Sequence, residues 1–112
     1  MAISEKIFHN VDLNLMVTFL VLYRERSVSR AAVLMKVGQP AVSGSLARLR
    51  SHFDDPLFLR TGRGVRPTGK AVEIAENLMP AFSCIEAVIT GRHPPLPDEE
   101  TSSQSSWSDD FL

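Results

Sequence analysis

The segment at residues 39–53 constrains the fold most, because its helical periodicity lies between two sequences that end helices, a glycine turn before it and a proline-containing run after it. Its apolar residues recur at steps of four, three and four, as one buried stripe of an α-helix requires: Val42, Leu46, Leu49 and Phe53. Pro40 suits the first helical turn, where its missing N–H costs nothing. The run Asp54-Asp55-Pro56 ends the pattern. The segment therefore predicts an amphipathic helix of about four turns.

The opposite side of this predicted helix is small and lacks acidic residues. At 100° per residue it carries Pro40, Ser43, Gly44, Ala47, Arg48 and Ser51. A slim face of this kind suits insertion into the roughly 12 Å wide major groove of DNA. Gln39, at the helix start, could pair with an adenine edge, and a serine hydroxyl could bond to either base type. The alternative is a small-residue face that packs against another helix of the protein.

Periodicity and capping residues predict three further helices, at 13–26, 30–35 and 69–90. Asp12, Ser29 and Thr68 are the expected N-caps of these helices. Gly38 lies in the tight turn before the residue-39 helix, and we expect it to take a backbone conformation that other residues avoid.

A small hairpin is expected between the last two helices. Residues 57–60 and 65–66 are strand candidates on either side of a flexible turn. Two short helices joined by a tight turn and followed by such a hairpin form a winged helix-turn-helix. The expected fold is therefore mainly α, with three helices and a two-stranded wing followed by a long helix.

Charge is distributed unevenly along the 112 residues, whose net charge is −1. Up to Arg92 there are 12 basic and 8 acidic residues, whereas residues 93–112 hold five acids and no Lys or Arg. A basic module favours a polyanionic partner, although many basic surfaces bind nothing. The prolines, serines and acids of residues 93–112 indicate a linker or an unfolded tail.

Composition excludes several other classes of protein. A single cysteine, Cys84, is incompatible with a disulfide framework or a multi-cysteine zinc site. The three histidines lack metal-ligand spacing, so we expect no metal and no cofactor. No apolar run reaches the roughly 18–20 residues of a membrane span, and the N-terminus is no signal peptide, so a cytoplasmic protein is expected. Residues 64–70 fit a phosphate-binding loop, but Ala71 stands where that loop needs Ser or Thr, so we expect no enzyme.

Four ordered runs resemble the amino-terminal domain of the LysR-type transcriptional regulators: SVSRAA at 27–32, GQPAVS at 38–43, LARLR at 46–50 and DPLFLR at 55–60. Residues 12–15 and 62–68 are similar to the subgroup that includes the regulators NodD and LeuO. The resemblance covers about residues 10–90. It implies a winged helix-turn-helix DNA-binding domain at 1–67 and a linker helix at 68–91 that forms dimers. It also implies a pseudo-palindromic operator and a separate effector-binding domain.

The resemblance implies base contacts from the residue-39 helix, phosphate contacts from the start of the preceding helix, and minor-groove contacts from the wing arginines. The predicted DNA-contacting residues are Ser29, Arg30, Gln39, Pro40, Ser43, Gly44, Ala47, Arg48, Arg60, Arg63 and Arg66. The chain departs from the family pattern at Gly38, which removes a capping hydroxyl, and at Gly44, which removes a candidate base contact. We therefore expect few direct base contacts, with a larger share of the sequence specificity coming from DNA shape.

The last predicted helix carries an apolar seam at steps of four and three: Ala71, Ala75, Leu78, Phe82, Ile85 and Ile89. We expect this seam to pair with a second copy, and Pro80 to bend the helix near 76–80. The alternative is that the seam packs on the protein's own core. Residues 92–112 are expected to be a hinge or tail without the effector domain, so no small-molecule effector is expected for this chain.

The function expected from these features is sequence-specific binding of double-stranded DNA in transcriptional regulation. The expected binding species is a homodimer, and higher oligomers are expected only in a full-length form. The alternative function is a shortened interaction module that pairs with full-length regulators and modulates them. Replacing Gln39 or Ser43 would distinguish the two, because only a DNA reader needs these side chains.

Overall fold

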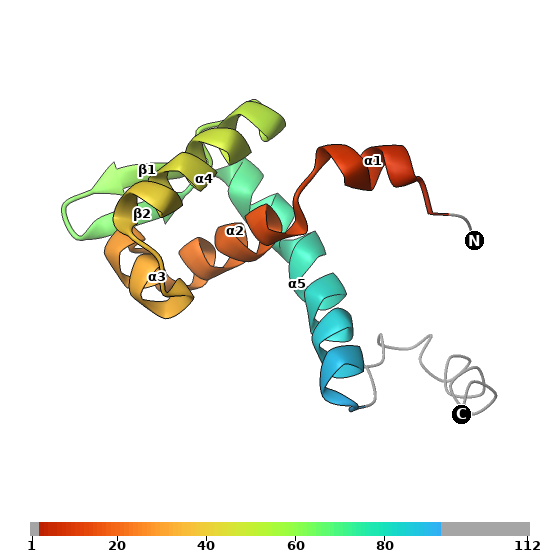
Figure 1. Cartoon of the computed structure of the whole chain (residues 1–112). Helices are drawn as coiled ribbons and strands as arrows, with labels where there is room; N and C mark the ends of the chain where they lie inside the picture. The colour runs from red at the N-terminus through yellow and green to blue at the C-terminus, as the bar shows by residue number, and fades with distance from the viewer. Residues whose placement is uncertain (1–2, 93–112) are drawn as a thin grey trace. The chain divides into compact units, whose positions relative to one another are not determined.

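The computed structural model describes residues 3–92, and this part contains five helices and one two-stranded sheet (Figure 1). The elements are α1 (Glu5–Asn10), α2 (Leu13–Glu25), α3 (Val28–Met35), α4 (Gln39–Phe53), β1 (Phe58–Thr61), β2 (Gly64–Pro67) and α5 (Gly69–Thr90). The strands pair antiparallel, with Phe58 opposite Pro67 and Thr61 opposite Gly64. The predicted winged helix-turn-helix fold is thereby confirmed. The predicted tail at 93–112 lies outside the described residues.

The chain divides into two compact units, residues 1–78 and residues 79–112, and α5 crosses the boundary as one helix that includes Pro80. The bend expected at this proline stays a prediction. We describe the two units separately. None of the described helices is long and apolar enough to cross a membrane.

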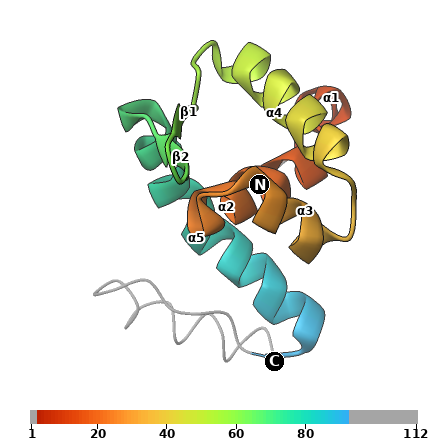
Figure 2. The ribbon, with the colours of Figure 1, turned by 90° about the vertical axis from the view of Figure 1, so that its left-hand side faces the viewer.

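The core of the first unit is built from one side of α2, α3, α4 and the start of α5, the helices that Figure 2 shows together with the hairpin; α1 contributes no buried residue. Phe19 and Leu22 of α2 are fully buried, and the Phe19 ring lies 5.4 Å from the ring of Phe58 at the start of β1. Such tilted aromatic pairs stabilise a fold by about 0.5–1.5 kcal/mol beyond the area they bury. The other buried apolar residues of this unit are Met16, Ala31, Ala32, Val42, Leu46, Leu49, Leu57, Ala71 and Ala75. The hairpin and the start of α5 therefore belong to the same core as the three-helix unit.

Two of the three predicted N-caps are confirmed. The Asp12 carboxylate accepts a hydrogen bond from the Asn14 N–H at 2.9 Å, and the Thr68 hydroxyl oxygen accepts one from the Ala71 N–H at 3.1 Å. The predicted cap of α3 is wrong, because the helix begins two residues earlier than expected. Ser27 caps it by accepting from the Arg30 N–H at 3.1 Å, and Ser29 lies in the first turn of the helix.

The unusual backbone conformation in the turn between α3 and α4 also lies elsewhere than predicted. Gly38 is extended, with φ −81° and ψ 157°, and caps α4 without a side chain. Lys36 takes the left-handed conformation instead, with φ 58°, and its N–H donates back to the last turn of α3. Arg26 and Asp54 end α2 and α4 in the same way, with φ 57° and 53°. A left-handed residue at this place satisfies orphan carbonyls at the end of a helix, which is why it recurs.

Candidate nucleic-acid interface

Helix α4 separates its residues by face as the sequence predicts. Val42, Leu46 and Leu49 are buried, and Phe53 is half-buried. The opposite side is exposed at Pro40, Ser43, Ala47, Arg48 and Ser51, and half-buried at Gly44. A helix that packed this side against its own chain would bury it, so the packing alternative fails for the described residues. The face remains available to a partner.

The start of α4 is open as well as polar. Gln39 and Pro40 are exposed, and no side chain caps the N–H groups of the first turn. The helix holds no Asp or Glu anywhere along its length, whereas Arg48 and Arg50 add positive charge. Pro40 has no N–H and the Ala41 N–H donates to the Gly38 carbonyl at 3.1 Å, so it is the helix dipole that gives this end an affinity for anions.

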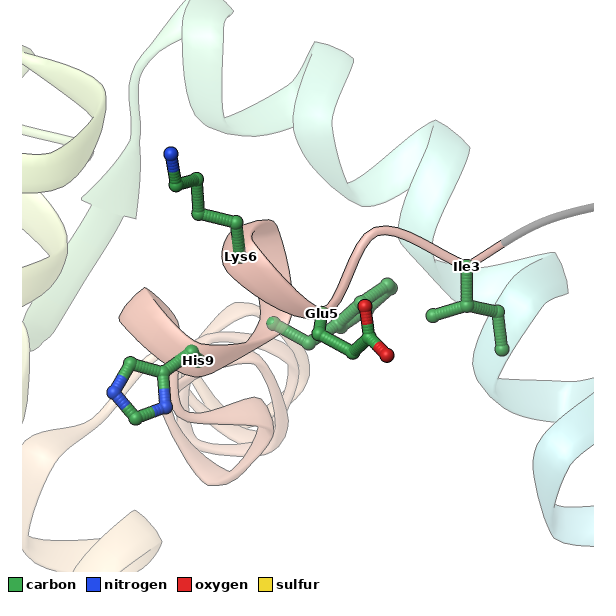
Figure 3. A pocket seen from close by; sticks show the side chains of 5 residues that line it. Ile3, Glu5, Lys6 and His9 are labelled. Atoms are coloured by element: carbon green, nitrogen blue, oxygen red, sulfur yellow. The ribbon is translucent and has the colours of Figure 1, made fainter.

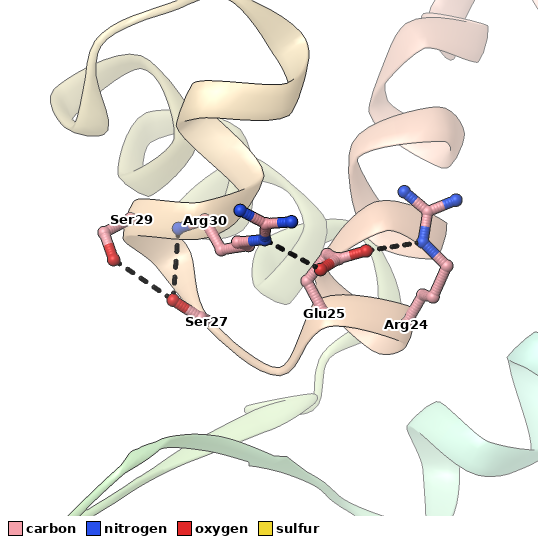
Figure 4. Close-up of polar contacts among 5 residues, drawn as sticks. All are labelled: Arg24, Glu25, Ser27, Ser29 and Arg30. Carbon is pink, nitrogen blue, oxygen red and sulfur yellow. Dashed lines mark hydrogen bonds and ion pairs between the residues drawn. The ribbon is translucent and has the colours of Figure 1, made fainter.

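Arg30 is exposed at the start of α3, but it is not free of the chain (Figure 4). Its Nε lies 3.4 Å from the Glu25 carboxylate, whose other oxygen accepts from the Arg24 Nε at 2.7 Å. Hydrogen bonding by Arg24, with a smaller contribution from Arg30, lowers the pKa of Glu25 below its ordinary value. The acid therefore stays charged and holds two cations at one edge of the helix pair. Ser29, also exposed, lies 3.1 Å from the capping Ser27 hydroxyl.

The three wing arginines are exposed but do not share one face of the hairpin. Arg60 lies opposite Val65, and Arg66 lies opposite Leu59. Cross-strand partners share a face and neighbours along a strand alternate, so Arg60 and Arg66 lie on opposite faces. Arg63 lies in the turn between the strands. The spacing of three in the sequence therefore distributes the charges around the wing.

Two side chains that the sequence analysis did not single out hold the base of the wing. Arg50, in the last turn of α4, donates from Nε to the Pro56 carbonyl at 2.7 Å and from Nη2 to the Phe58 carbonyl at 2.8 Å. The Asp55 carboxylate accepts from the Leu57 N–H and from the Thr68 hydroxyl, both at 2.8 Å. Charge-assisted hydrogen bonds of this kind are about twice as strong as neutral ones. The wing is therefore tied at its base to the end of α4 and to the start of α5.

A shallow hollow beside α1 is lined by Ile3, Glu5, Lys6, Phe8 and His9 (Figure 3). The sequence analysis missed α1, which is only six residues long and buries none of them. All five lining side chains are exposed, so the hollow has no enclosed polar group that would orient a ligand. Among residues 3–92, no group of His, Cys, Asp and Glu is placed to hold a metal ion.

The predicted dimerisation seam divides at the boundary between the two units. Ala71 and Ala75 are fully buried inside the first unit, so they serve the protein's own core as the alternative reading had it. Leu78, Phe82 and Cys84 are half-buried. Ile85 and Ile89 are 43% and 77% exposed, and the neighbouring Val88, which was not predicted, is 69% exposed. The second unit thus presents large apolar side chains that the described chain does not cover.

The fold and this surface define a class, the winged helix-turn-helix domains; the relatives that the chain matches are named as transcriptional regulators and not as enzymes. The sequence profile of the bacterial regulatory helix-turn-helix proteins of the lysR family matches residues 13–71, more than half of the chain. The chain belongs to this family. The resemblance read from the sequence motifs is thereby confirmed.

Named relatives and solved structures agree with this assignment. The transcriptional activator NagR of a Ralstonia species is 45% identical over 83 residues, which cover 74% of this chain and 28% of NagR. The probable transcriptional regulator PA0477 of Pseudomonas aeruginosa superimposes with a TM-score of 0.72 and 34% identity, over 84% of this chain and 32% of that one. DarR of Vibrio fischeri, solved in complex with DNA, has a TM-score of 0.64 and 28% identity, over 73% and 28% of the two chains. The chain spans about a third or less of the length of each of these proteins.

Proposed function

We propose that this chain binds double-stranded DNA sequence-specifically in transcriptional regulation, with α4 in the major groove. The exposed face of α4 carries the proposal: it is free of acids, most of its residues are small, and the opposite side of the helix buries Val42, Leu46 and Leu49. A narrow, uncharged-to-basic helix face can approach base edges without repulsion from phosphates or steric hindrance. The DNA complex of the family member DarR supports the same partner.

Within the groove, we assign base contacts to the N-terminal half of α4. Gln39 offers a bidentate amide, Ser43 a hydroxyl, and Pro40 and Ala47 apolar surface for a thymine methyl group. Arg48, on the same face, suits a phosphate. Gly44 contributes no side chain, so two polar side chains near one helix end do most of the direct reading. Shape readout then has a larger share of the specificity.

Phosphate and minor-groove contacts are assigned to α3 and the wing. Ser29 and Arg30 suit a phosphate, with Arg30 exchanging its Glu25 partner for the DNA backbone. In the wing, Arg63 lies in the turn, so we expect it to contact the minor groove whichever face of the hairpin is turned toward the DNA. Arg60 and Arg66 lie on opposite faces, so we expect one of them to contribute more than the other. Arginines in a narrow minor groove read DNA shape.

We further propose a homodimer formed through the linker helix, in the region where α5 exposes Ile85, Val88 and Ile89. A two-fold dimer presents two recognition helices to two half-sites, and a pseudo-palindromic operator follows from that symmetry. The domain limits of 1–67 and 68–91 stay a prediction, and the start of α5 shares the core of the first unit. A cytoplasmic location is part of the proposal, since a bacterial regulator must reach the chromosome.

The test is a salt titration of binding to a two-fold symmetric candidate duplex, beside a scrambled duplex of equal composition. We expect the association constant to fall steeply with salt, by about 0.9 logarithmic units per phosphate contact for each tenfold rise in salt concentration. We also expect a preference for the symmetric site. Gln39→Ala and Ser43→Ala should each reduce that preference by about 1–3 kcal/mol. His52→Ala is the matched control, because His52 is exposed on α4 about 180° from Ser43. No binding at low salt would overturn the proposal.

A second candidate function rests on the apolar side chains exposed on α5. A chain that acts by pairing with full-length relatives needs this surface and not the α4 face. Under that function Gln39→Ala would have no effect, whereas Ile89→Asp would abolish the activity. The two substitutions together therefore decide between the candidates.

A further inference from the structure

The wing is tied to the turn between α2 and α3 by a backbone contact between residues far apart in the chain. The Val65 N–H donates to the Arg26 carbonyl at 3.0 Å, and Gly64 lies against the same carbonyl. Figures 1 and 2 both show the hairpin beside this turn. We call this contact the wing latch, formed by Arg26, Gly64 and Val65. We infer that Gly64 is a positioning residue, which sets where the wing arginines stand relative to α4.

Gly64 is needed at the latch for two independent reasons. Its φ of +153° is a conformation that residues with a side chain rarely adopt. A Cβ added there would overlap the Arg26 carbonyl oxygen and come within 3.4 Å of its carbon. Those atoms are backbone, so relieving the overlap requires the wing and the turn to move apart. Gly62, two residues away in the same wing, has no heavy atom within 4 Å of such a Cβ.

The acceptor side of the latch is held rigidly. Arg26 ends α2 with φ 57°, and its N–H donates to the Leu22 carbonyl at 2.8 Å. Its side chain folds back on the helix: Nε donates to the Tyr23 carbonyl at 2.6 Å, and the guanidinium lies 5.0 Å from the centre of the Tyr23 ring. The carbonyl that receives the wing therefore has a fixed position, and adjustment falls on the hairpin.

The same turn also fixes the start of α3. Ser27 directly follows Arg26, and its hydroxyl caps α3 at the Arg30 N–H. One short turn thus places both Arg30 and the wing, while Arg50 anchors only the base of the hairpin. Two anchors, at the base and beside Val65, define the direction of a hairpin where one would leave it able to swing. The distance from the α4 face to Arg63 is set by this pair of anchors.

This inference rests on the proposed function, and its test uses matched glycine variants. Gly64→Ala and Gly62→Ala are compared with the parent chain for binding to a labelled mixed-sequence duplex across a salt series. Urea unfolding and far-UV circular dichroism check that each variant is folded. We expect Gly62→Ala to bind as the parent does. Gly64→Ala should bind at least about tenfold more weakly, with a salt dependence reduced by roughly one phosphate contact or more.

A double-mutant cycle separates positioning from general loosening of the fold. Arg63→Ala should weaken binding in the parent but have little further effect in the Gly64→Ala background, because the arginine is already displaced. Full additivity of the two effects would overturn the inference, as would a folded Gly64→Ala variant that binds like the parent. If Gly64→Ala fails to fold, an ester in place of the Val65 amide removes the N–H donor without adding an atom, and the same measurements apply.

Failure of the proposed function has a different signature. A parent chain that binds no duplex at low salt overturns both the function and the positioning role. Hydrogen exchange at the Val65 amide then shows whether the latch is present as a purely structural contact. It should be slow in the parent and in Gly62→Ala, and fast in Gly64→Ala. A parent that binds DNA while Gly64→Ala is unaffected overturns the inference alone.

Discussion

Helix α4 and the second half of α5 are both amphipathic, yet they expose opposite kinds of side chain. The exposed side of α4 is small and polar, with no acid on the helix, and its apolar stripe is buried in the first unit. The second half of α5 instead exposes Ile85, Val88 and Ile89. A polar, slim surface suits a hydrated groove, whereas large exposed aliphatic side chains gain most from another apolar surface. The two helices therefore call for different partners.

The largest effect should come from breaking the buried side of α4. Leu49 is 0% exposed, and Leu49→Ala should lower the free energy of unfolding by about 2–5 kcal/mol, through lost burial and the cavity left behind. The neighbouring Arg48→Ala should change it by less than about 0.5 kcal/mol, because that side chain is exposed. Urea denaturation measures both. Similar losses for the two variants would mean that α4 does not separate its faces.

A next largest effect is expected from the exposed side of α5. Ile89→Asp should weaken self-association at least about tenfold, because a charge would have to be buried at an apolar contact. The stability of the first unit should be unchanged. Sedimentation at a series of concentrations measures the dissociation constant. Ser83→Asp adds the same charge at an exposed position on another side of α5 and is the control. A parent chain that remains monomeric throughout would contradict the dimer.

Filling the glycine in α4 should have a smaller effect, of opposite sign. A Cβ at Gly44 would meet no heavy atom within 4 Å, so Gly44→Ala should stabilise the domain by up to about 1 kcal/mol. Gly38→Ala should give no such gain, because glycine is the better N-cap of the two. Thermal unfolding distinguishes the variants. A destabilised Gly44→Ala variant would show that the α4 face is more closely packed than described.

The smallest effect concerns Glu25 and depends on pH. Its pKa is lowered in the folded state, so its stabilising contribution is present above the ordinary value of 4.5 and is lost as the pH falls through the lower folded value. Glu25→Gln should therefore be slightly less stable than the parent at pH 7, with the difference vanishing in acid. It should also bind DNA more tightly at neutral pH, since Arg24 and Arg30 are released. Urea midpoints across pH and a DNA titration test these outcomes; a constant difference at every pH would contradict the first.

The sequence predicted those parts of the fold that short-range rules determine. The bounds of α4 follow from Pro40 in its first turn and the break at 54–56, and its buried face follows from periodicity. The cap of α3 was misplaced because Ser27 and Ser29 are equally good capping residues two positions apart. Helix α1 was missed because six residues with no buried side chain leave no apolar stripe.

Contacts between residues far apart in the chain explain the features that the sequence did not predict. Gly64 reads locally as part of a flexible turn, and only the approach of Arg26, distant in the chain, shows why a glycine is needed there. In the same way, the spacing of Ala71 and Ala75 fits packing against a partner helix as well as it fits packing in the protein's own core, where they are buried. Their periodicity shows that one side is buried and does not show against what.

The three left-handed helix ends have a consequence for the domain's capacity to change. Arg26, Lys36 and Asp54 each hold a conformation that costs a side-chain-bearing residue roughly 1 kcal/mol and costs glycine almost nothing. Lys36→Gly and Asp54→Gly, both at the surface, should thus stabilise the domain, whereas Arg26→Gly would also lose the hydrogen bond to the Tyr23 carbonyl that holds the wing latch. Variants with the two stabilising glycines should tolerate destabilising new residues on the α4 face, so that altered DNA specificity can be selected without loss of the fold.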